Sequence, residues 1–147
     1  MKNFKIILTF IFAGFLLGNC SSQKQNSESD QNLRHEWLFV SFQNFSKEKL
    51  VKSEAKINLN IRSENKDQYS AKMGCNSLFF TAKIKSGNKI EFSQVGGTKM
   101  YCEGMMDLES AFGKALPMMT SYKVDGHYLT LSDGKGNEMK FLAADWD

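Results

Sequence analysis

Sulfur provides the most reactive side chains in this chain of 147 residues, which contains three cysteines. Cys75 and Cys102 could form a disulfide, remain as two buried thiols, or bind a metal as thiolates. We favour a disulfide, because the pair lacks the CxxC spacing of redox and zinc sites and because the N-terminus indicates export to an oxidising compartment. In the chain-entropy account, a bridge across this separation stabilises the fold by about 3.5 kcal/mol.

A second group of sulfur atoms raises the question of copper. Six methionines lie near the two cysteines in the sequence: Met73, Met100, Met105, Met106, Met118 and Met119. Thioether sulfur is a good ligand for Cu(I). However, the MxM and MxxM repeats that would place thioethers side by side are missing. Met73 and Met105 also fall on apolar faces, where methionine commonly fills gaps in a core. The sequence therefore predicts no metal site and no cofactor.

Acid–base chemistry would need carboxylates or histidines that face one cleft. Asp107 and Glu109 are two residues apart in a predicted helix, so they point in different directions. Glu109 is expected instead to bond to nearby main-chain donors or to the turn at residues 74–76. His35 and His127 are the only imidazoles, and neither lies in a recognisable motif with a nucleophile and a carboxylate. We therefore expect no catalytic residues and no enzyme activity, since GxSxG, HExxH, P-loop and GxGxxG motifs do not occur either.

The N-terminus resembles a bacterial lipoprotein export signal. Two lysines precede an uncharged apolar run, residues 6–17, that is too short to span a bilayer as a helix. The following LGNC sequence at residues 17–20 resembles a lipobox, in which the cysteine is lipidated and becomes the mature N-terminus. Asn19 departs from the small residue usual before that cysteine. Cys20 is nevertheless the predicted lipidation site, since no small-x-small site for ordinary signal peptidase cleavage fits better upstream.

This interpretation divides the chain into three parts. Residues 1–19 are the expected signal peptide, residues 20–32 the lipidated cysteine and a flexible tether, and residues 33–147 a single domain. The tether contains no aromatic or aliphatic side chain and so cannot bury enough surface to fold. Loss of the signal peptide removes two lysines and lowers the formal net charge of +3 by two. The remaining charge is too small to indicate nucleic acid as a partner.

The domain itself consists mainly of short segments in which apolar and polar residues alternate, as in half-buried strands. These segments are residues 57–61, 69–73, 78–84, 90–92, 122–124, 129–131 and 139–141. Residues 34–42 carry apolar residues on both faces and are expected to be buried on both. Ser86-Gly87-Asn88 predicts a hairpin, and Asp125-Gly126 predicts a two-residue type I′ connection. Such short connections imply antiparallel neighbours.

One segment has helical periodicity instead. Pro117 is expected to end this helix. Between Gly104 and Leu116, five apolar residues fall on one helical face: Met105, Leu108, Phe112, Ala115 and Leu116. The alternating charges of residues 47–52 indicate a solvated loop. We therefore predict a mainly β (α+β) fold, a single small antiparallel β-barrel-like domain with one helix at about residues 104–116.

Three short motifs carry a family resemblance. Gly74-Cys75-Asn76 predicts a tight turn, because Gly and Asn both tolerate positive φ. It is followed by Thr98, Met100 and Cys102 in the pattern T-[RK]-M-x-C, and then by Glu109, Phe112 and Leu116 in the pattern E-x-x-F-x-x-x-L. In this order the motifs resemble those of the META domain of HslJ-like envelope proteins, over about residues 33–143.

The resemblance implies a lipid-anchored or periplasmic protein of the bacterial cell envelope, on the outer membrane or the periplasmic face. Family members are linked to heat-shock expression and to novobiocin resistance. The first hypothesis is a non-catalytic, lipid-anchored envelope protein that binds a protein partner or acts under stress. The alternative is a barrel that holds a small apolar ligand, lined or filled by four inward aromatic residues: Phe80, Phe92, Tyr122 and Phe141. Filling is the favoured outcome, because these side chains are bulky.

Overall fold

A computed structural model describes residues 31–60 and 68–146 of the chain. The predicted signal peptide, Cys20 and most of the predicted tether lie outside these residues, as does Ile61 of the first alternating segment. Within the described part of the chain, no helix is both long enough and apolar enough to cross a membrane.

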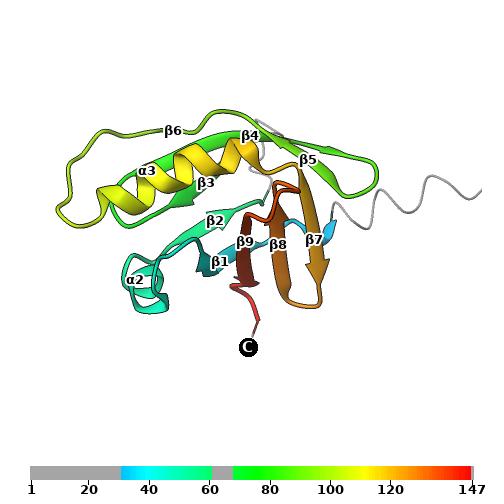
Figure 1. The fold of residues 1–147 in the computed structure, drawn as a ribbon, viewed down its shortest axis with the longest axis horizontal. Coiled ribbons are helices and arrows are strands. Elements are labelled where there is room, and N and C mark those ends of the chain that lie inside the picture. The colour runs from blue at the N-terminus through cyan, green and yellow to red at the C-terminus, as the bar shows by residue number, and fades with distance from the viewer. Residues whose placement is uncertain (1–30, 61–67, 147) are drawn as a thin grey trace, which may run out of the picture.

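Antiparallel strands form the framework of the described structure (Figure 1). They are β1 (Glu36–Phe42), β2 (Lys56–Asn58), β3 (Gln68–Lys72), β4 (Ser77–Lys85), β5 (Lys89–Phe92), β6 (Gly96–Gly97), β7 (Ser121–Asp125), β8 (Tyr128–Ser132) and β9 (Glu138–Ala143). The strand order is β3-β2-β1-β9-β8-β7-β5-β4, and β4 pairs back onto β3, which closes an eight-stranded barrel. The two-residue strand β6 also pairs with β4, beyond the end of β5. The predicted fold class is therefore confirmed.

One main helix, α3 (Met106–Ala115), packs against the barrel and continues into a 3-10 turn, η1 (Leu116–Met118). Leu108 and Phe112 of α3 are fully buried. The Phe112 ring meets Phe39 of β1 and Phe80 of β4 edge-on, with centroids 6.1 and 6.3 Å apart. Pro117 does not stop the helical path at once, because the first turn of the 3-10 helix tolerates a residue without an N–H.

A second, short helix was not expected from the sequence. Residues 47–52, predicted as a solvated loop, form α2 (Lys47–Lys52). The Ser46 hydroxyl oxygen accepts a hydrogen bond from the Lys49 N–H at 3.2 Å and caps the helix start. Leu50 is the buried residue of this helix. A single apolar position gives no periodicity, so a helix of this length has no hydrophobic signal in the sequence.

The interior of the barrel is filled by side chains from both ends of the chain. The four inward aromatic residues named above are all buried. Phe39 packs on Phe141 with ring centroids 4.2 Å apart, and Phe80 meets Phe92 at 5.7 Å. Trp37 is also buried, and its indole N–H donates to the Leu33 carbonyl at 3.0 Å. The favoured prediction of a filled barrel agrees with this packing.

Two local predictions were wrong. Strand β1 is not buried on both faces, since Leu38 and Val40 are 40% and 36% exposed. Only one face of β1 meets the core, and the register shifts between Phe39 and Ser41. The second concerns the β7–β8 hairpin, whose loop residues are Gly126 and His127, because Asp125 pairs with Tyr128. Only the first loop residue has positive φ, which is the pattern of a type II′ turn rather than type I′.

Candidate functional site

The turn between β3 and β4 places the first motif. Gly74 has φ +110°, a conformation that disfavours residues with a Cβ. A Cβ at this position would also lie 2.9 Å from the Met105 sulfur and 3.3 Å from Cβ of Ser53. The structure contains the expected disulfide between Cys75 and Cys102, with Cα atoms 5.9 Å apart. The turn is therefore joined covalently to the segment that leads into α3.

The next residue, Asn76, is 3% exposed and is bonded to Glu109 of α3. Its main-chain N–H donates to Oε2 of Glu109 at 2.8 Å, and its side-chain Nδ2 donates to Oε1 at 2.8 Å. The sequence predicts that Glu109 bonds either to nearby main-chain donors or to this turn, and the structure has the contact with the turn. Glu109 is itself only 7% exposed, and both its oxygens accept hydrogen bonds. This is a charge-assisted pair that fixes α3 against the barrel.

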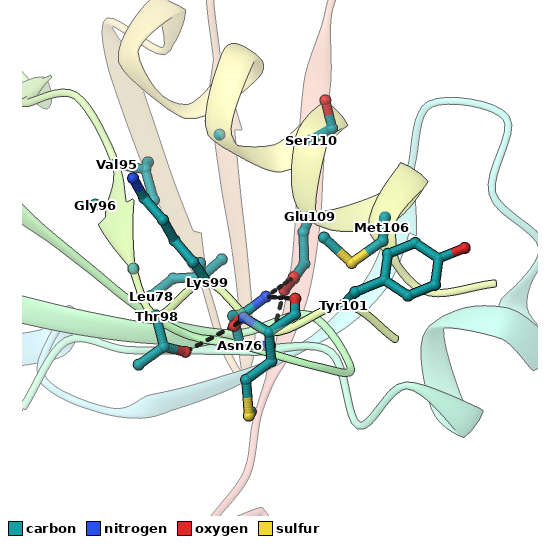
Figure 2. Close-up of a pocket in the computed structure, with 13 residues that line it drawn as sticks. Asn76, Leu78, Val95, Gly96, Thr98, Lys99, Tyr101, Met106, Glu109 and Ser110 are labelled. Carbon is teal, nitrogen blue, oxygen red and sulfur yellow. Dashed lines mark hydrogen bonds between the residues drawn. The ribbon is translucent and has the colours of Figure 1, made fainter. Parts of the chain in front are cut away.

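The second motif binds the other side of the same amide (Figure 2). Oδ1 of Asn76 accepts from the Thr98 hydroxyl at 2.7 Å and from the Met100 N–H at 2.8 Å. Nδ2 also donates to the Met100 carbonyl at 3.0 Å. The Thr98 hydroxyl oxygen accepts a further bond from the Ser77 N–H at 3.2 Å. One buried amide thus connects three segments of the chain that are distant in sequence.

The remaining motif residues serve the core rather than this network. Phe112 and Leu116 are fully buried on the barrel side of α3 and η1. The methionines are dispersed: Met73 is buried, while Met100 and Met118 are more than half exposed. Met105 accepts a bond from the Ser53 hydroxyl at its sulfur, 3.4 Å away. Among residues 31–60 and 68–146, no group of three or more His, Cys, Asp or Glu is placed to hold a metal ion.

A groove of about 490 Å³ lies beside this network. One wall is the extended chain from Val95 through β6 to Tyr101, and the other is the face of α3 that carries Met106, Ser110 and Gly113. Figure 2 shows Glu109 pointing down from α3 to Asn76 at the floor, and the Tyr101 ring lying beside Met106. The sequence analysis did not predict this groove. Two features of the sequence could have indicated the groove: the glycine pair at 96–97 and a glycine inside the helix. Residues without side chains leave such space.

A second pocket, of about 330 Å³, brings the two histidines together at the end of the barrel. His35 Nδ1 lies 2.9 Å from Oδ2 of Asp145, and the His127 ring stacks on Trp146. The hydrogen bond with His35 lowers the pKa of the Asp145 carboxyl below its ordinary value. The described residues that line this pocket include no Ser, Thr or Cys, so they supply no nucleophile for a catalytic triad.

Comparison with known proteins settles the family. The family model described as META domain matches residues 31–146, a range that includes every residue the structure describes. The chain belongs to the META domain family. The resemblance seen in the three motifs is therefore confirmed. META membership does not point to a known enzyme class.

Solved structures agree on the fold of this META domain. The chain is similar to a protein from Burkholderia xenovorans solved by NMR, with 18% identity, 87% of this chain and 94% of that chain covered, and a TM-score of 0.61. A second NMR structure has 18% identity, covers 79% of this chain and 94% of that chain, and gives a TM-score of 0.53. At such identities the likeness extends to the fold alone. No curated protein is significantly similar to this chain.

Proposed function

We propose that this META-domain protein is a non-catalytic, lipid-anchored component of the bacterial cell envelope that binds a partner and acts under envelope stress. The non-catalytic part of this proposal is supported by the hydrogen bonds that Glu109 accepts. Glu109 is the one carboxylate among the described residues that line the groove, and both of its oxygens accept hydrogen bonds from Asn76. A general acid or base must be within reach of a substrate proton, and this carboxylate is occupied by donors of the fold itself.

The anchoring part of the proposal rests on the sequence before the domain. The basic residues, the short apolar run and the LGNC sequence support export followed by lipidation of Cys20. Acyl chains contribute roughly 0.8 kcal/mol for each buried CH₂ group, and two or more chains hold a protein stably on a bilayer. The cell envelope is also a compartment in which the Cys75–Cys102 bridge is stable.

Binding inside the barrel is the weaker alternative. Inside the barrel, Phe80 contacts Phe92, and Phe39 contacts Phe141. The Phe112 ring of α3 meets Phe39 and Phe80, so side chains occupy the described interior. The groove outside the barrel, rather than its interior, provides the space for a partner. The stress role is taken from the family, whose members are linked to heat-shock expression and to novobiocin resistance.

Replacement of the lipidation residue tests the proposal. The wild-type chain and Cys20→Ser are expressed in a bacterium, and Triton X-114 partitioning of the cell lysate is measured. We expect the wild type in the detergent phase and Cys20→Ser in the aqueous phase or retained with its signal peptide. In a strain that lacks the protein, the wild type is expected to restore growth on novobiocin better than the variant. Equal partitioning of the two chains would contradict the anchor, and equal growth of all strains would contradict the stress role.

A further inference from the structure

The groove beside the Asn76 network has the shape of a binding site on the surface. Its volume of about 490 Å³ lies within the range of small-molecule pockets, roughly 300–1,000 Å³. Tyr101 at its rim is 82% exposed and Met100 is 57% exposed, so both side chains are accessible to a partner. The walls are held rigidly, because the disulfide and the Asn76 bonds fix both the extended segment and the start of α3.

The main chain of the extended wall offers hydrogen bonds toward the groove. On its inner side, Gly96 pairs with Phe79 of β4, the Thr98 N–H donates to the Ser77 carbonyl at 3.1 Å, and the Met100 N–H donates to Asn76. In an extended strand, alternate residues direct their N–H and C=O groups to opposite sides. Gly97, Lys99 and Tyr101 therefore direct theirs away from β4.

These three residues form a free strand edge. In the described part of the chain, their main-chain groups make no hydrogen bond to other elements, and all three residues line the groove. We call Gly97, Lys99 and Tyr101 the groove edge. An exposed strand edge next to a pocket is the arrangement by which several domains bind an extended peptide as an added strand.

The side chains around the groove edge define the chemistry of such a peptide. Lys99 is the one cationic residue that lines the groove, and no ion pair satisfies it among the described residues. Figure 2 shows its side chain extending along the groove toward Val95. The remaining lining is largely apolar, with Leu78, Val95 and Met106. An acidic side chain would face Lys99, while apolar side chains of the same peptide would contact these residues.

We propose that the groove binds an extended peptide segment with alternating apolar residues and a central acidic residue, which pairs with the groove edge as an additional strand. This proposal rests on the proposed function, because it identifies the partner of this envelope protein as a protein with an exposed or disordered segment of that composition. The glycines of β6 allow the close approach of a second main chain.

Binding is measured with the full-length protein, purified from membranes in detergent, and fluorescein-labelled hexapeptides. The peptides alternate Val or Leu with Thr or Ser and carry Glu, Gln or Lys at a central position. Fluorescence anisotropy gives the affinity, and hydrogen–deuterium exchange gives the location. We expect the Glu peptides to bind at least ten times more tightly than the Lys peptides, and to protect amides within residues 96–102. N-methylation of the peptide amides that face the groove edge should weaken binding about tenfold.

Two variants and one matched control locate the site. Gly113→Leu fills the groove from the helix side; a Cβ there meets only Val95, at 4.0 Å, and glycine is itself unfavourable in a helix. We expect this variant to fold with unchanged thermal stability or better and to lose peptide binding at least tenfold. Lys114→Leu adds the same side chain at the next residue, outside the groove, and should bind as the wild type does. Lys99→Glu should reverse the preference from Glu to Lys peptides.

The outcomes separate this inference from the proposed function. Absence of binding by every peptide at millimolar concentration, protection outside residues 96–102, or equal binding by Gly113→Leu would overturn the groove proposal. None of these results changes where Cys20→Ser partitions. Conversely, an aqueous wild-type protein would overturn the anchor while the peptide measurements would still report on the groove.

Discussion

At the scale of single residues, Asn76 is the centre of the structure around the family motifs. Its side-chain amide and its main-chain N–H together make five hydrogen bonds, to Glu109, Thr98 and Met100. Only an amide of this length can donate to a carboxylate while it accepts from a hydroxyl and an N–H on its other side. Hydrogen-bonding geometry thus accounts for the residue types of the motif.

Glu109→Gln tests this explanation. The substituted side chain must place an NH₂ group against a donor of Asn76, so one buried donor loses its acceptor. We expect the free energy of unfolding, measured by urea denaturation, to fall by about 2 kcal/mol. Glu103→Gln makes the same chemical change at an exposed position and should alter stability by less than about 0.5 kcal/mol. If the two variants were equally stable, the Asn76–Glu109 contact would have no structural importance.

The sequence predicted this site only in part, for a physical reason. Turn residues and cysteines are local signals, so the turn at 74–76 and the Cys75–Cys102 pair could be recognised. The bonds of Thr98 and Met100 to Asn76 depend on the register of β6 against β4. A local pattern of two glycines does not encode that register. The groove edge follows from the same register and was missed for the same reason.

At the scale of elements, most strands were predictable because they have one buried face and period-two alternation. The two-glycine strand β6 has neither feature and was not predicted. The helix α2 was not, because its position depends on the burial of Leu50 alone. Strand β1 was misread, since apolar residues on an outer face do not by themselves show that something covers them. The loop between β8 and β9 spans residues 133–137. In the structure it is ordered by Asp133.

Asp133 makes the stability of this loop depend on pH. Hydrogen bonds from Asn137 Nδ2 and from the Lys135 N–H, at 2.6 and 2.7 Å, lower the pKa of its carboxyl below the ordinary value. The ionised carboxyl therefore stabilises the folded state above its unfolded pKa of about 3.9, and this contribution is lost as pH falls through the lower folded pKa. We expect Asp133→Asn to be less stable than the wild type at neutral pH, by a difference that closes below about pH 4.

Thermal unfolding of both chains between neutral pH and pH 3 measures this difference. In a companion variant, Asn137→Ala, the pKa of Asp133 followed by NMR should move up toward its ordinary value, because the strongest of its hydrogen bonds is removed. A stability difference that stays constant across the whole acid range would show that the carboxylate does not order the loop.

At the scale of the whole molecule, the barrel is a closed scaffold with a filled interior and a helix fixed to its side. The closure pairs β3 with β4 and leaves β6 as the strand with a free edge among the described elements. The disulfide and the Asn76 network join this edge and α3 to the barrel at the same place. A rigid surface groove of this kind is what the proposed binding role requires.

The most direct test of this account is top-down mass spectrometry of the full-length protein isolated from the envelope of the bacterium that expresses it. We predict a chain that begins at Cys20, carries acyl chains on that residue, and contains one cross-link between Cys75 and Cys102 without free thiols. Two results together would contradict the account of an anchored domain in an oxidising compartment. The first is a chain that retains residues 1–19 or begins after Cys20 without lipid. The second is alkylation of Cys75 and Cys102 without prior reduction.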